Sequence, residues 1–215
     1  MANVTAEFTE DPKTFLEKNI VIVPEPTNPG NSGPREFWFN EDKGLVSLKS
    51  GKPGAGASVQ AYWLSWKSKD ATVLDVGNAA GYFFTSQMTG CRFKVLSSGK
   101  NPKVAHIAGD LSKSQRQKKE DALLETVDQS VRVTGSGRRL SVSGGGVHGY
   151  TGQVDKGAEG DHGSAFVFGI KDGDDNWTFK AQIVKANLAD EFKFKSAYKQ
   201  GKGFVPRIAE LYEFK

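Results

Sequence analysis

Residues 62–110 read YWLSWKSKDATVLDVGNAAGYFFTSQMTGCRFKVLSSGKNPKVAHIAGD. Within this stretch, residues 93–96 and residues 103–107 are short apolar runs of the kind that predicts β-strands. The residues between them, 97–102, contain a glycine and a proline and predict a turn. Two strands joined in this way can pair side by side, so that side chains from both strands share one face.

Cys91 and His106 are the candidate reactive residues of this stretch. Cys91 follows Gly90 at the entrance to the first strand, where little side-chain bulk covers a thiol and backbone N–H groups can reach a developing oxyanion. His106 lies in the second strand and can face Cys91 across the pair. An imidazole in this position can hold the thiol as a thiolate. The alternatives are that Cys91 is a small buried apolar residue and that His106 is a polar residue at a strand end.

The rest of the 215-residue chain predicts strands and loops with few helices. It contains 25 glycines and 14 phenylalanines but only two methionines, which favours a core of aromatic and β-branched residues. Helices are predicted at residues 12–18, capped by Asp11, and at residues 112–127, capped by Ser112. No repeat or linker interrupts the pattern, so one domain covering residues 1–215 is expected. Further strands are predicted at residues 19–23, 36–39, 45–48, 58–64, 130–134, 139–143, 164–170, 177–184 and 205–212.

Composition excludes several classes of protein. The 29 basic and 25 acidic residues nearly balance, which argues against a nucleic-acid partner. No apolar run approaches eighteen residues, so no membrane span is expected. Residues 1–10 lack the basic start and apolar stretch of a signal peptide. We therefore expect a monomer that is cytoplasmic, or that is secreted or injected by a non-classical route, and that acts in a cytosol.

Other motifs do not indicate a metal or an organic cofactor. The single cysteine excludes an internal disulfide and a multi-cysteine zinc site. Residues 144–149 fit G-x-G-x-x-G, but no helix start follows them. The acidic turn at residues 171–176 lacks the glycine and glutamate positions of a calcium-binding EF-hand loop. The basic residues of the second predicted helix are expected to form a solvated face; they are Lys113, Arg116, Lys118 and Lys119.

Two segments of the stretch carry a family resemblance. Residues 83–91, FFTSQMTGC, resemble the F-F-T-x-x-[hydrophobic]-[S/T]-G-C element of the Burkholderia lethal factor family of glutamine deamidase toxins. Residues 63–67, WLSWK, look like the W-L-x-W-K segment of that family. More distantly, the stretch is similar to the catalytic domain of the cytotoxic necrotizing factors, which share the S/T-G-C nucleophile and a downstream histidine. The spacing from Cys91 to His106 lies nearer to the necrotizing factors.

The resemblance implies an α+β fold, a sandwich of two mixed β-sheets flanked by helices and long loops. It implies that Cys91 is the nucleophile, that His106 is the general acid and base, and that Thr85 orients the imidazole. The reaction would convert a glutamine of a target protein to glutamate through a cysteine thioester, without a cofactor. The implied target is a protein such as a translation-initiation helicase or a small GTPase.

Two other functions stay open. One is a different cysteine acyl-transfer enzyme on the same scaffold, such as a transglutaminase, a protease or a chemoreceptor-type deamidase. The other is a catalytically silent binding protein of the same fold. The hydroxyl of Thr85 can alternatively bond only to the backbone. Trp63 and Trp66 are predicted to be core and rim aromatic residues rather than platforms for a substrate.

Overall fold

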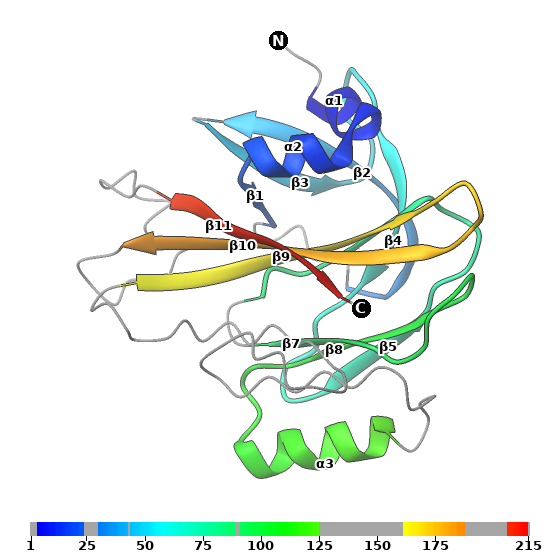
Figure 1. Cartoon of the computed structure of the whole chain (residues 1–215), viewed down its shortest axis with the longest axis vertical. Coiled ribbons are helices and arrows are strands. Elements are labelled where there is room, and N and C mark those ends of the chain that lie inside the picture. The colour runs from blue at the N-terminus through cyan, green and yellow to red at the C-terminus, as the bar shows by residue number, and fades with distance from the viewer. Residues whose placement is uncertain are drawn as a thin grey trace.

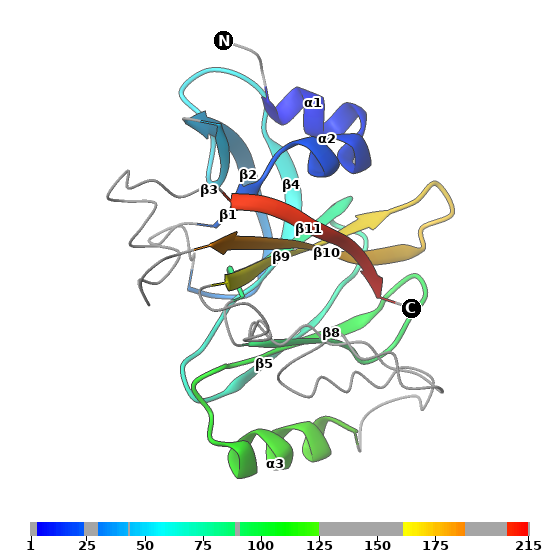
Figure 2. The ribbon, with the colours of Figure 1, turned by 60° about the vertical axis from the view of Figure 1, so that its left-hand side comes forward.

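The structure is a computed structural model that describes residues 4–23, 30–42, 44–88, 91–124, 161–187 and 206–214. In this part of the chain the elements stack in four layers (Figure 1). Two short helices, α1 (Val4–Glu10) and α2 (Pro12–Lys18), cover one face of a large β-sheet. A smaller sheet lies on the opposite face, and helix α3 (Lys113–Leu124) covers that smaller sheet on its outer side. Figure 2 shows the same stacking from a second direction.

The described strands form two sheets. The larger has the order β1-β3-β2-β4-β6-β9-β10-β11 and is mixed, because the β1–β3 and β4–β6 pairs are parallel and the others antiparallel. The smaller has the order β5-β8-β7 and is antiparallel. The strands of the larger sheet are β1 (Val21–Ile22), β2 (Gly33–Asp42), β3 (Leu45–Ser50), β4 (Val59–Leu64), β6 (Tyr82–Thr85), β9 (Asp161–Lys171), β10 (Trp177–Asn187) and β11 (Pro206–Phe214). Those of the smaller sheet are β5 (Ala71–Asp75), β7 (Arg92–Val95) and β8 (Lys103–Ile107).

This arrangement confirms the expected α+β sheet sandwich with flanking helices, although only the larger of the two described sheets is mixed, and the smaller one is antiparallel. The predicted helix starts are confirmed by their capping contacts. Asp11 accepts a hydrogen bond from the Thr14 N–H at 3.0 Å, and Ser112 Oγ accepts one from the Gln115 N–H at 3.3 Å. Helix α1 and strands β5 and β6 were not anticipated. The strands predicted at residues 130–134 and 139–143, and the glycine motif at residues 144–149, lie outside the described residues.

The two faces of the larger sheet carry separate apolar cores, because side chains alternate along each strand. Phe83 points into the inter-sheet core, which lies between the two sheets. Phe84 points into the helix-side core, which lies under α1 and α2. The inter-sheet core includes Leu64, Phe83, Phe93, Val104, Val167 and Phe179. The helix-side core includes Phe8, Phe15, Phe39, Trp63, Phe84 and Phe166.

A buried amide holds helix α2 and strand β1 against strand β10. Gln182 has no exposed surface, and its Oε1 accepts a hydrogen bond from the Val21 N–H at 2.8 Å. Its Nε2 donates to the Leu16 and Asn19 carbonyl oxygens, both at 2.6 Å. A buried amide without partners would be costly, so these bonds fix the position of the N-terminal layer.

Charged residues join helix α3 to the smaller sheet. Arg92 and Lys94 alternate with Phe93 along β7 and therefore point away from the inter-sheet core, toward α3. There Glu120 accepts a hydrogen bond from Arg92, and its Oε2 lies 3.7 Å from Lys94 Nζ. The side chains of Lys94 and Glu120 are only 5% and 8% exposed. Glu120 therefore compensates two largely buried cations.

In the described residues no helix is long and apolar enough to cross a membrane.

Replacing Glu120 by alanine should destabilise the protein strongly. The variant would leave Arg92 and Lys94 buried without their anion, a change that typically costs about 3 kcal/mol or more. Urea unfolding of Glu120→Ala measures the loss. The matched control is Asp121→Ala on the same helix, where an exposed carboxylate accepts a bond from Gln117; it should change stability by only about 0.5 kcal/mol. Equal effects of the two variants would contradict the role given to Glu120.

Candidate active site

Thr85 and His106 meet between the two sheets. Thr85 ends β6 on the face it shares with Phe83, and His106 lies in β8 on the face it shares with Val104. The Thr85 Oγ1 and His106 Nδ1 atoms are 2.7 Å apart. Both side chains are almost fully buried, at 0% and 1% exposed. The structure thus brings together two of the three residues that the sequence singled out.

The hydrogen-bond pattern assigns the tautomer of His106. Thr85 Oγ1 donates its one hydrogen to the Leu64 carbonyl oxygen at 2.7 Å. The hydroxyl oxygen must therefore accept from the imidazole, which places the ring proton on Nδ1. Nε2 is left as a lone-pair acceptor. It is buried and has no hydrogen-bond partner among the described residues.

Burial controls the charge of His106. Desolvation lowers its pKa from 6.5 to about 3, because the charged ring would lose its hydration and no described anion replaces it. At neutral pH the imidazole is therefore uncharged, and Nε2 can accept a proton. Buried polar atoms are usually paired in folded proteins, and the described residues hold six others without a partner, among them the Trp63 indole nitrogen.

Cys91 lies immediately before β7 and belongs to the inter-sheet core. Phe93 is the register partner of His106 across the β7–β8 pair. Cys91 stands two residues before Phe93, so it is the diagonal neighbour of His106, and such neighbours lie about 7–8 Å apart. Because His106 Nε2 has no partner in the described residues, the thiol is not hydrogen-bonded to it in this state. Cys91 is 7% exposed.

The charge state of Cys91 differs from the one expected. Burial is the main influence and raises the pKa of the thiol, and the Asp110 carboxylate also raises it. The expectation that His106 holds a resting thiolate is therefore wrong for this structure. The physical reason is that both groups lie in the apolar layer between the sheets, where separated charges are costly. The resting pair is a neutral thiol and a neutral imidazole.

Three residues around the sulfur were not anticipated. The Gly109 backbone, the positive charge of Arg116 and the Trp66 side chain each lower the pKa of the Cys91 thiol. Arg116 was expected on a solvated face, but its Nη2 donates to the Gly109 carbonyl oxygen at 2.9 Å. Lys118 and Lys119 are exposed, as expected.

Of these three residues, only Trp66 lies in a segment that the sequence had singled out. Trp66 belongs to the WLSWK segment, and its predicted rim position is confirmed, since it packs at the border of two apolar clusters. Trp63 is fully buried in the helix-side core, as predicted. Arg116 sits in a strongly charged helix, and no local pattern separates it from its solvated neighbours.

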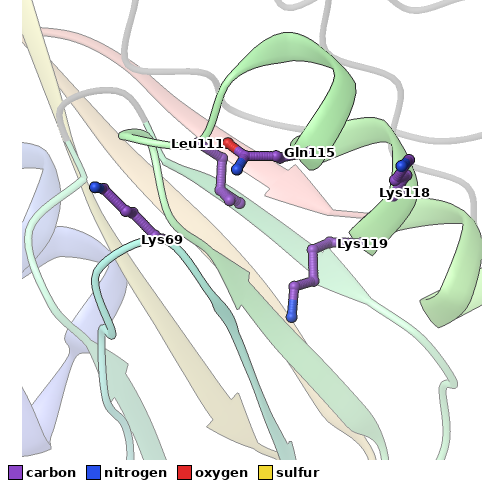
Figure 3. Close-up of a pocket in the computed structure, with 5 residues that line it drawn as sticks. All are labelled: Lys69, Leu111, Gln115, Lys118 and Lys119. Carbon is purple, nitrogen blue, oxygen red and sulfur yellow. The ribbon is translucent and has the colours of Figure 1, made fainter.

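A basic groove of about 330 Å³ lies beside the turn that follows β8. Figure 3 shows the five side chains that line it, Lys69, Leu111, Gln115, Lys118 and Lys119. Leu111 also belongs to the apolar cluster between the smaller sheet and α3, where it packs with Trp66. The groove therefore borders the turn that contains Gly109.

Comparison with known proteins identifies the fold. No protein-family profile and no curated protein matches the chain. Among solved structures, the chain is similar to the C-terminal domain of CNFy from Yersinia pseudotuberculosis, with a TM-score of 0.52 and 11% sequence identity. The similarity covers 98% of this chain and 97% of that domain. The chain therefore has the fold of the C-terminal domain of a cytotoxic necrotizing factor. At this identity the similarity shows the fold and not the activity.

The neutral state of His106 predicts a pH dependence of stability. In the unfolded chain the histidine binds a proton below its ordinary pKa of 6.5, whereas the folded protein does not until the pH approaches 3. The free energy of unfolding should therefore fall as the pH drops between roughly 6 and 4, with a contribution of about 1.4 kcal/mol per pH unit from this residue.

Urea unfolding at several pH values measures this contribution against His106→Gln, which cannot titrate. The native protein should lose more stability per pH unit than the variant, because the acidic residues act equally on both. Parallel pH profiles for the two proteins would show that His106 is not buried as a neutral ring.

Proposed function

We propose that the chain is a toxin-like protein glutamine deamidase with Cys91 as its nucleophile. The observation that carries the proposal is the buried arrangement of His106, whose Nδ1–H is held by Thr85 and whose Nε2 has no partner in the described residues. In acyl transfer the general base must be held in one orientation and must keep one nitrogen available for the proton of the nucleophile. His106 has both properties, and its strand pairs with the strand that begins after Cys91.

The neutral resting pair favours general-base activation in the first step. As the sulfur of Cys91 attacks the carboxamide carbon of a substrate glutamine, its proton passes to Nε2 of His106. Thr85 keeps Nδ1–H oriented while the ring becomes charged. The resulting imidazolium then gives its proton to the departing nitrogen, so that ammonia leaves and a thioester forms.

Hydrolysis of the thioester completes the reaction. His106 Nε2 removes a proton from a water molecule, and the resulting hydroxide attacks the thioester carbon. The carbon–sulfur bond breaks, the proton returns to the sulfur, and a glutamate side chain is released. The net change is glutamine plus water to glutamate plus ammonia, which requires no cofactor. The backbone N–H of Cys91 is a proposed donor to the oxyanion in both steps.

The fold supports this choice of chemistry, because the necrotizing factor catalytic domains that the sequence resembles are associated with deamidation. The FFTSQMTGC and WLSWK segments support the same reaction by their likeness to the Burkholderia lethal factor family. The proposed partner is a target protein in a cytosol, a translation-initiation helicase or a small GTPase, and the enzyme is proposed to act as a monomer.

Mass spectrometry of a eukaryotic cell lysate incubated with the protein tests the proposal. A specific glutamine of one protein should be converted to glutamate, with release of ammonia. Cys91→Ser should abolish the conversion while the thermal midpoint stays nearly unchanged, because only the nucleophile is weakened. If an added primary amine were incorporated at the glutamine instead, the chain would be a transglutaminase. Conversion by Cys91→Ser at the native rate would refute the proposal.

Thr85→Val tests the positioning of the imidazole. The substitution keeps the volume and removes the hydroxyl, so His106 loses the partner of Nδ1–H and kcat/KM should fall by about ten- to a hundredfold. Thr85→Ser keeps the hydroxyl and should lose much less. The two variants are compared on the target found in the lysate. Equal activity of Thr85→Val and Thr85→Ser would show that the hydroxyl does not position the ring.

A further inference from the structure

The basic groove beside the turn that follows β8 is built from two separate parts of the chain. Lys69, in the connection between β4 and β5, lines one side of it (Figure 3). Helix α3 lines the other side with Gln115, Lys118 and Lys119. Leu111 lies between the two sides and is buried, whereas the four polar residues are exposed. The groove therefore combines one apolar contact surface with three ammonium groups.

The two sides of the groove are joined by polar contacts. Asp70 Oδ1 accepts a hydrogen bond from Lys119 Nζ at 2.6 Å, which ties the β4–β5 connection to α3. Asp110 accepts one from Ser68 Oγ at 2.7 Å and one from the Lys69 N–H at 2.9 Å. These contacts hold Lys69 at a φ of 54°, a left-handed conformation that is uncommon outside glycine. The groove is therefore preformed, and a ligand does not have to order it.

Two of the three lysines keep their charge available for a ligand. Lys119 is already paired with Asp70. Lys69 and Lys118 are exposed, and neither ammonium group forms an ion pair with another described residue. Lysine ammonium groups attract carboxylates. The volume of about 330 Å³ is at the low end of the range for ligand pockets, about 300–1,000 Å³. It gives room for a few side chains of a peptide.

The groove lies within a short peptide's length of Cys91. Arg92 is the register partner of Ile107 across the β7–β8 pair. Continuing that register places Cys91 opposite Ala108, about 5 Å away. Leu111 is three residues beyond Ala108, which is at most about 11 Å along the chain. An extended peptide of about five residues spans this separation, so one segment can present a glutamine to Cys91 and fill the groove.

We propose that the groove binds an acidic segment of the target protein, about five residues from the glutamine that is deamidated. The inference rests on the proposed function, because it concerns the partner of the same site. Asp or Glu side chains of the target pair with Lys69 and Lys118, and an apolar side chain covers Leu111. A nucleic acid is a poorer match, because no aromatic residue for base stacking lines the groove in the described part of the chain.

Binding of a synthetic peptide tests the groove without catalysis. The protein is Cys91→Ser, and the probe is a fluorescein-labelled peptide with a central glutamine and acidic residues about five positions to either side. A second peptide has amides in place of the acids. The acidic peptide alone should bind, measured by fluorescence anisotropy, and should shift the NMR signals of Leu111, Gln115 and Lys118. Failure to bind, equal binding of the two peptides, or shifts confined to other parts of the protein would overturn the proposal.

A double variant, Lys69→Asn with Lys118→Gln, removes the two available charges. Asparagine tolerates the left-handed backbone at residue 69, and Lys119 is kept because its pair with Asp70 holds the groove together. The Kd of the acidic peptide should rise by about five- to tenfold. Thermal unfolding checks that the variant is folded, and Lys118→Gln alone, on an exposed helix surface, should change the Kd in the same direction.

The matched control removes the same charge elsewhere. Lys13→Gln with Lys18→Gln changes two exposed lysines of helix α2, which covers the other face of the larger sheet, and should leave the Kd unchanged. Equal effects of the two double variants would show that the peptide responds only to net charge and would overturn the groove. A single-stranded oligonucleotide that shifts the same signals and binds more tightly than the peptide would overturn the choice of ligand.

These outcomes separate the groove from the proposed reaction. Binding of the acidic peptide would support the groove even if no deamidated protein were found, and its failure would overturn the groove even if Cys91 proved to be the nucleophile. With a target from the lysate, the groove double variant should raise KM by about five- to tenfold and leave kcat nearly unchanged, because the groove binds the target away from the reacting atoms. An unchanged KM would overturn the proposal.

Discussion

One hydroxyl group connects the two sheets of this protein. Thr85 donates to Leu64 within the larger sheet and accepts from His106 of the smaller sheet. A hydroxyl has a single hydrogen, so satisfying the Leu64 carbonyl fixes the proton of the imidazole on Nδ1. The orientation of the ring, the position of the proton on Nδ1 and the neutral charge of His106 all follow from that bond and from burial. The hydrogen bond that fixes the imidazole is therefore also a contact between the two sheets.

Much of this site was predictable because its parts are close in sequence. The strands around Cys91 and His106 form a local pair, and the turn signal between them is strong, so their shared face could be inferred from residues 91–107 alone. Thr85 came from the FFTSQMTGC segment and not from any physical pattern. Its contact with His106 depends on how the two sheets stack, which local sequence does not encode.

The parts that could not be predicted depend on tertiary packing. Helix α3 is so rich in charge that Arg116 and Glu120 look like solvated residues, and only docking onto β7 buries them. A lowered pKa was expected for the Cys91 thiol, but burial raises it. Local sequence carries no measure of desolvation. The fold, by contrast, was implied by the resemblance of residues 63–67 and 83–91, and it is shared with a solved domain at 11% identity.

The neutral, 7% exposed thiol of Cys91 also bears on chemical durability. Oxidants and alkylating agents attack the thiolate and need access to it, and a cysteine with a raised pKa in an apolar layer offers neither. A permanently ionised nucleophile would be open to sulfenic acid formation whenever the protein met an oxidising environment. In the proposed reaction the thiol ionises only during the attack on the substrate, so the sulfur stays protected from oxidation between turnovers, at the cost of a slower first chemical step.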